Sequence, residues 1–232
     1  MSYLVYCVLR EGDRVPDGLP PGVGGGKVSL LAQDGLAASF SRLRPGEAVP
    51  TLPRVQAYAR VIEALHTRCT VLPLRFGCEL SSRAELVELL RAHRAEFQSA
   101  LDKVEGCVEL GVRALLGRRR GRASGDVGRA LRLSPGRAYL AGRKARYTEQ
   151  DQKRSRSVAA ARRIEKAFHR LFVTCLTEPP RAGCEQLLTL HFLVRRHDQE
   201  RFCQAFRRLE ESTPEKLLLT GPWPPYNFAS GH

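Results

Sequence analysis

The sequence predicts an α+β protein with two domains. Short apolar runs rich in β-branched and aromatic residues alternate with longer segments whose apolar residues recur at helical spacing. The chain has 232 residues, enough for one large or two small domains, and 43% of them are hydrophobic, enough to build a core. We place the domains at residues 1–104 and 105–220, followed by a Pro- and aromatic-rich tail at 221–232 that docks on the body.

The first domain is expected to be a mixed α+β unit. Residues 3–9 are apolar and β-rich, which predicts a buried strand, and the Gly- and Pro-dense residues 12–27 predict a loop. Glu85 follows Ser82 at the spacing of a capping box, so a helix should begin at Ser81 or Ser82 and continue to Leu101. The other expected elements are strands over 28–31 and 36–40 joined by a turn at Gln33-Asp34-Gly35, a helix over 54–66 and a strand over 71–76.

The first loop contains Gly22-Val23-Gly24-Gly25-Gly26-Lys27, which only partly fits a phosphate-binding loop. The first Gly of that motif would fall on Pro21, and the Ser or Thr that should follow the Lys is Val28. The next residues are strand-like, whereas that chemistry needs a helix N-terminus. We interpret the segment as a flexible glycine loop.

The second domain is expected to follow the order β-α-β-α-β, which suggests a modified ferredoxin-like layer with one long helix. Residues 105–115 alternate as in a half-buried strand, and the Gly- and Arg-rich residues 117–135 should form a loop. The long helix is predicted from Arg137 to Thr177, where Glu178-Pro179-Pro180 would stop it. The remaining elements are a strand over 187–194, a helix over 199–209, a strand over 215–220 and a closing segment in which three prolines forbid regular structure.

Positive charge is concentrated in residues 113–170, which hold eighteen Lys and Arg against four Asp and Glu. That excess equals the formal net charge of the whole chain, +14. From Thr148 to Ser157 no residue is strongly apolar, so this part of the long helix should stand clear of the core and suit an acidic partner. We place the partner-binding surface on Arg143, Lys144, Arg146, Lys153, Arg154 and Arg156.

Other functional classes find little support. No apolar run approaches the ~20 residues of a membrane span, and no secretory signal is present, so we expect a soluble cytoplasmic protein. The seven cysteines are scattered, which favours free thiols, and a zinc site from His66, Cys69 and Cys78 would lack a CxxC pair and a fourth ligand. No catalytic motif is found, so we expect no enzyme activity, catalytic residue, metal, cofactor or small-molecule substrate.

Four passages together resemble the gas vesicle protein F/L family. The most specific is the closing Leu219-Thr220-Gly221-Pro222-Trp223-Pro224-Pro225-Tyr226-Asn227-Phe228, followed by Val71-Leu72-Pro73-Leu74-Arg75-Phe76-Gly77. The other two are the opening Tyr3-Leu4-Val5-Tyr6-Cys7-Val8 and Gly136-Arg137-Ala138-Tyr139-Leu140. The passages span nearly the whole chain in the right order. Residues 117–135 depart from the family, because some relatives are expected to carry extra strands there.

The resemblance implies an accessory structural and assembly protein of gas vesicles, with two α+β domains and no enzymatic chemistry. Its implied partners are the major shell protein and other accessory gas vesicle proteins, and its implied location is the gas vesicle in the cytoplasm. Within the motifs we assign structural roles to Arg75, Phe76, Trp223 and Tyr226. Arg75 should form an internal ion pair rather than contact a partner carboxylate. Replacing Trp223 by Ala should cost roughly 3–5 kcal/mol if its ring is buried.

The basic segment leaves two other interpretations open. Residues 113–170 could form a nucleic-acid-binding module, with Arg118-Arg119-Arg120-Gly121-Arg122 on phosphates, although no recognised nucleic-acid motif accompanies it. The segment could also be a solvated helix face with no partner. An enzyme with a cysteine nucleophile is a third class, and it would need a thiol of low pKa.

Overall fold

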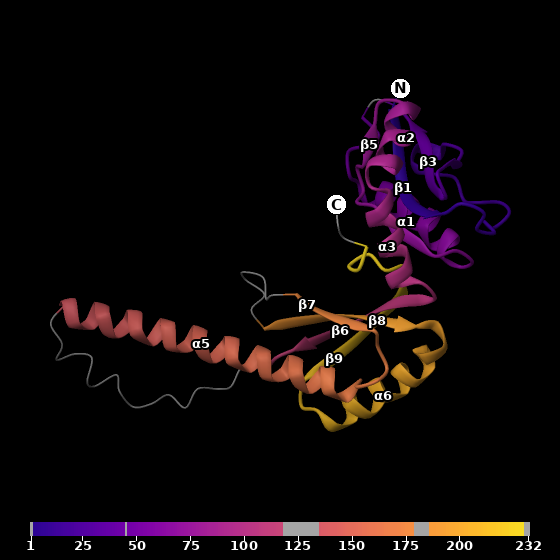
Figure 1. Cartoon of the computed structure of the whole chain (residues 1–232). Coiled ribbons are helices and arrows are strands. Elements are labelled where there is room, and N and C mark those ends of the chain that lie inside the picture. The colour runs from indigo at the N-terminus through magenta and orange to yellow at the C-terminus, as the bar shows by residue number, and fades with distance from the viewer. Residues whose placement is uncertain (1, 45, 118–134, 179–185, 230–232) are drawn as a thin grey trace. The chain divides into compact units, whose positions relative to one another are not determined.

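In the residues that the structure describes, this chain is a mixed α/β protein, as the sequence predicts, with one sheet of five strands and one of four (Figure 1). The computed structural model describes residues 2–44, 46–117, 135–178 and 186–229, with the backbone alone for 135–142, 145, 146 and 149. The chain divides into two units, which are described separately below. Unit 1 comprises Met1–Leu110, Leu193–Arg196 and Gly221–His232, and unit 2 comprises Gly111–Phe192 and His197–Thr220.

The sheet of unit 1 has the strand order β2-β3-β1-β4, with β5 also paired to β1. Its strands are β1 (Ser2–Arg10), β2 (Ser29–Gln33), β3 (Leu36–Leu43), β4 (Val71–Pro73) and β5 (Glu79–Leu80). The predicted turn joins β2 to β3: Asp34 and Gly35 both have positive φ, 53° and 84°, as a tight hairpin turn requires. The strand expected over 71–76 ends at Pro73.

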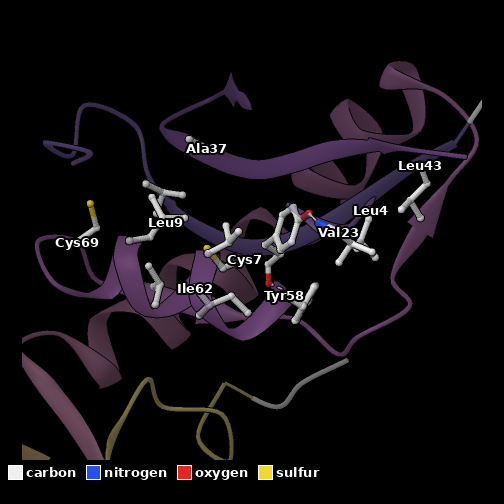
Figure 2. Packing of buried hydrophobic residues seen from close by; sticks show 13 residues of the cluster. Leu4, Cys7, Leu9, Val23, Ala37, Leu43, Tyr58, Ile62 and Cys69 are labelled. Carbon is white, nitrogen blue, oxygen red and sulfur yellow. Dashed lines mark hydrogen bonds between the residues drawn. The ribbon is translucent and has the colours of Figure 1, made fainter. Parts of the chain in front are cut away.

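Strand β1 is buried on both faces, and a bulge changes which of its residues belong to each of the two cores. Its pairing with β3 shifts register between Val5 and Cys7, so Tyr6 and Cys7 both belong to one cluster. That cluster also holds residues of α1 (Leu52–His66), and Figure 2 shows Tyr58 and Ile62 beside β1. Val5 and Val8 belong to the second cluster, with residues of α2 (Arg83–Ala92) and α3 (Arg94–Val104). The sheet is therefore covered on both faces.

The helix expected from Ser82 to Leu101 is in fact two helices. Ser82 is confirmed as the N-cap, since its Oγ accepts the Glu85 N–H at 3.2 Å. The Glu85 carboxylate accepts the Ser81 N–H at 2.8 Å, one residue before the N–H that it would reach in a regular capping box. The break falls at His93, whose φ of −108° and ψ of 18° depart from helical values. Apolar spacing continues through the break, so it could not reveal the bend.

The glycine loop, which was expected to be flexible, is tied to Tyr6 by a hydrogen bond. The Tyr6 hydroxyl accepts the Val23 N–H at 3.0 Å, and the Gly22 N–H donates to the Gly26 carbonyl at 2.8 Å. A Cβ at Gly22 would lie 2.2 Å from the Tyr6 hydroxyl, so only glycine fits there. Val23 is fully buried in the cluster around β1.

The second sheet has the strand order β7-β8-β6-β9. In chain order its elements are β6 (Cys107–Leu115), α5 (Pro135–Ala167), β7 (Thr174–Glu178), β8 (Leu187–Arg195), α6 (Gln199–Ser212) and β9 (Lys216–Trp223). Strand β6 lies between two neighbours and is buried from Cys107 to Val112, rather than on one face as expected. The predicted loop over 117–135 falls almost entirely outside the described residues.

The long helix ends at Ala167, ten residues before its predicted end at Thr177. Phe168 begins a turn in which Arg170 takes a positive φ of 68°, which is incompatible with a continuing helix. The β-branched Val173 and Thr174 then lead into β7, a strand that the sequence analysis missed. Phe168 remains in the core, stacked on Phe202 at 4.0 Å between ring centroids.

The closing segment begins as regular structure, contrary to expectation. Strand β9 continues through Gly221 and Pro222 to Trp223, which is possible because β9 is an edge strand of its sheet. After it, Pro224 and Pro225 are buried.

Candidate protein-binding surface on α5

The first half of α5 lies outside the core wherever its side chains are described. All described side chains from Arg143 to Arg156 are exposed, on every side of the helix. Burial begins at Ser157 and continues at Ala160 and Ile164. Pro135–Ala167 is 33 residues, about 50 Å at 1.5 Å per residue, and Figure 1 shows its first half extending beyond the second sheet. The sequence expectation of a helix half standing clear of the core agrees with this arrangement.

The exposed half carries its basic residues on a recognisable stripe. At about 100° per residue, Arg143, Lys153 and Arg154 fall within an arc of roughly 100°. Ile164 falls on the same arc, so the stripe continues the face that is buried further along the helix. Lys144 and Arg156 lie outside this arc, and the Arg146 side chain lies outside the described part of the chain. We call Arg143, Lys153 and Arg154 the basic stripe.

Tyr147 belongs to the same face and was missed from the sequence. Its side chain is 56% exposed, and the Arg143 guanidinium lies 5.6 Å from its ring centroid. The Arg143 Nη2 also lies 3.4 Å from the Tyr147 hydroxyl. Exposed Tyr and Arg side chains are the types that dominate protein interfaces. The i, i+4 spacing of the two residues was the available signal.

The motif around Arg75 is held by its backbone and by Phe76, and Arg75 forms no ion pair with any residue that the structure describes. The Tyr58 hydroxyl donates to the Leu74 carbonyl at 2.9 Å, and the Leu74 N–H donates to the Tyr6 carbonyl at 2.9 Å. Phe76 packs edge-on against Tyr58, with ring centroids 5.3 Å apart. The Arg75 side chain is exposed, so the expected buried ion pair is wrong.

The tail is anchored by Tyr226 and Asn227, whereas Trp223 is 44% exposed. The condition for a loss of about 3–5 kcal/mol on replacing Trp223, a buried ring, is therefore not met. Tyr226 packs against the cluster beside β1, and burial raises its pKa. The Asn227 N–H donates to the Glu109 Oε2 at 2.9 Å, and its side-chain amide donates to Oε1.

Glu109 is a key residue that the sequence did not reveal. It is only 3% exposed and lies 118 positions from Asn227 in the chain. A buried carboxyl group needs hydrogen-bond donors, and the tail supplies two of them. The Glu109–Asn227 pair thus fixes the family-like closing motif to β6.

The described residues offer no support for catalysis by a thiol or a metal. Burial raises the pKa of the Cys7 and Cys175 thiols to about 12, which opposes formation of a thiolate. Burial and the neighbouring Arg196 lower the pKa of His66 to about 4. Within these residues, no three His, Cys, Asp or Glu side chains gather as metal ligands, and no helix is long and apolar enough to cross a bilayer.

Comparisons with known proteins agree on one family. The family described as gas vesicle synthesis protein GvpL/GvpF matches residues 2–230. Gas vesicle protein L of Streptomyces sp. is 28% identical over 97% of this chain and 91% of its own length. Gas vesicle protein F2 of Halobacterium salinarum is 24% identical over 98% of this chain and 91% of its own.

Solved structures show the same fold. The crystal structure of GvpF from Anabaena sp. matches with a TM-score of 0.78 at 19% identity, covering 99% of this chain and 98% of that one. GvpF from Microcystis aeruginosa matches with a TM-score of 0.76 at 15% identity over 99% of both chains. Since the family match extends over nearly every residue, this chain belongs to the gas vesicle synthesis protein GvpL/GvpF family.

Proposed function

We propose that this chain is an accessory structural and assembly protein of gas vesicles that works by binding and catalyses no reaction. Its partners are the major shell protein, other accessory gas vesicle proteins, or both, and it acts at the gas vesicle in the cytoplasm. The observation that carries this proposal is the first half of α5, a helix surface exposed on all sides and rich in Arg and Lys.

The basic stripe is the part of α5 that best suits a partner. A helix that is polar on all sides buries no apolar surface in a core, so binding a partner is the role that best accounts for it. Arg143, Lys153 and Arg154 present their charge along one face with Tyr147 among them. Such a face favours an acidic surface and accelerates association at low ionic strength. Charge–charge attraction of this kind weakens as salt rises.

The second sheet and its helices would hold the exposed half of α5 in place for binding. In chain order the second sheet and its helices read β-α-β-β-α-β, with strand order β7-β8-β6-β9. We assign this part to a modified ferredoxin-like domain, corresponding to the segment expected over 105–220. We likewise assign residues 1–104 to a first domain and residues 221–232 to a tail docked on the body.

A charge-reversal experiment tests the proposal. Arg143, Lys153 and Arg154 are changed together to Glu, and Arg60, Arg207 and Arg208, which are also exposed, are changed to Glu as a control of equal charge. The tagged variants are used to capture gas vesicle proteins from vesicle-forming cells. We expect the stripe variant alone to lose the shell protein or accessory proteins, with circular dichroism unchanged.

Two outcomes would contradict the proposal. Equal loss of capture in both variants would mean that net charge matters and the stripe does not. Capture of nucleic acid instead of gas vesicle proteins, verified by a gel shift that weakens with salt, would favour the nucleic-acid-binding module of residues 113–170.

A further inference from the structure

A small pocket in unit 1 collects three cationic side chains from separate elements. Its volume is about 290 Å³, and it is lined by Tyr3, Lys27, Ser29, Phe40, Arg42 and Arg83. This volume is close to the lower end, roughly 300 Å³, of small-molecule sites. The pocket lies outside α5, and the proposed function does not use it.

Strand register explains why these residues meet. Tyr3 of β1 lies opposite Arg42 of β3, and Ser29 of β2 lies opposite Phe40 of β3. Opposed residues in an antiparallel pair share a face, and so do residues two apart in one strand, such as Phe40 and Arg42. The sheet therefore presents all four side chains on the face that α2 and α3 cover elsewhere.

Aromatic side chains form the inner wall. Phe40 is 4% exposed, and Tyr3 contacts it edge-on with ring centroids 5.5 Å apart. Arg83, the first residue of α2, places its guanidinium 5.6 Å from the Phe40 ring centroid. This cation–π contact holds Arg83 over the pocket.

The charge of the pocket is uncompensated. Lys27, Arg42 and Arg83 are exposed at its rim, and none of the side chains that line it is acidic. Within the described part of the chain, no ion pair joins these three side chains to a carboxylate. Three neighbouring cations repel one another, so a bound anion of more than one charge would stabilise them.

We propose that this pocket binds a small phosphate monoester. Guanidinium groups match the geometry of phosphate oxygens, and the Ser29 hydroxyl supplies a further donor. The phosphoryl group meets Lys27, Arg42 and Arg83, and the apolar part of the ester lies against Tyr3. A dianion matches three cations better than a single carboxylate does.

Titration calorimetry of the full chain with phenyl phosphate, inorganic phosphate and benzoate at constant ionic strength tests this. We expect saturable binding of phenyl phosphate, weaker binding of inorganic phosphate because it lacks the ring, and weaker binding of benzoate because it has a single charge. Changing Arg42 and Arg83 to Gln should reduce the affinity for phenyl phosphate about tenfold or more.

The control removes the same charge elsewhere, by changing the exposed Arg60 and Arg68 to Gln, and should leave affinity unchanged. An equal loss in this control, benzoate binding as tight as phenyl phosphate, or no saturable binding would each overturn the assignment. Since α5 is unaltered in every variant, these results are independent of the capture experiment.

Discussion

Replacing Asn227 by Ala tests whether the closing motif is fixed by its contact with Glu109. The change removes the side-chain amide that donates to Glu109 Oε1 but keeps the backbone N–H bond of 2.9 Å. Glu109 is 3% exposed, so water cannot readily replace the lost donor. Hydrogen bonds to charged groups contribute about 1.5–3 kcal/mol, and we expect the free energy of unfolding to fall by roughly 2 kcal/mol.

Urea denaturation followed by tryptophan fluorescence suits this measurement. The chain has a single Trp, and Trp223 lies four residues before Asn227. Circular dichroism in parallel reports the helices, so a fluorescence change at lower urea than the dichroism change would indicate local release of the tail. Gln150→Ala, which removes an exposed amide from α5, is the matched control and should leave stability nearly unchanged.

A double-mutant cycle with Glu109→Gln isolates the pair itself. We expect the combined variant to be less destabilised than the sum of the single changes, because Glu109→Gln already removes the negative charge that strengthens the bond from the Asn227 amide. A loss under about 0.5 kcal/mol for Asn227→Ala, or strict additivity of the two changes, would refute the role of the Glu109–Asn227 pair in fixing the closing motif.

Three other changes test the core, a helix cap and a buried histidine. Phe168→Ala should lower the free energy of unfolding by about 3–5 kcal/mol in urea, since Phe168 is fully buried and stacked on Phe202; a loss near 1 kcal/mol would contradict this packing. Ser82→Ala should cost about 1 kcal/mol because it removes the acceptor of the Glu85 N–H, and Ser82→Asp, which keeps an acceptor, should not. Burial and Arg196 lower the pKa of His66 to about 4 from 6.5, so the unfolded chain binds the proton first and stability falls as pH drops from about 6.5 towards 4. His66→Gln should remove up to about 3 kcal/mol of that pH dependence in denaturation at several pH values, and an unchanged slope would argue against it.

Local signals in the sequence predicted local structure. The apolar run at the start identified β1, and the Ser82–Glu85 spacing identified the start of α2, because each depends on neighbours in the chain. The exposed half of α5 could be predicted in the same way, since the lack of apolar residues there is a local property of the sequence.

Features that depend on tertiary contacts escaped prediction. The apolar stripe of α5 continues into Phe168 and beyond, so periodicity alone could not show that Arg170 reverses the backbone. An internal position for Arg75 was inferred from its apolar neighbours, yet its side chain is exposed. The contact between Glu109 and Asn227 joins positions with no shared sequence signal. The pocket beside Phe40 depends on strand register, which composition does not encode.

The exposed turns of α5 affect the free energy of partner binding, because their own stability depends on the buried turns that follow them. About six turns of helix precede Ser157 and are held by backbone hydrogen bonds and by their covalent continuity with the packed turns. Since the packed turns already meet the cost of nucleation, each added turn needs only the small cost of propagation. The first turns of α5 can therefore unwind and re-form without unfolding the rest of unit 2. A protein that binds α5 near Arg143 would slow amide hydrogen exchange along the whole exposed half.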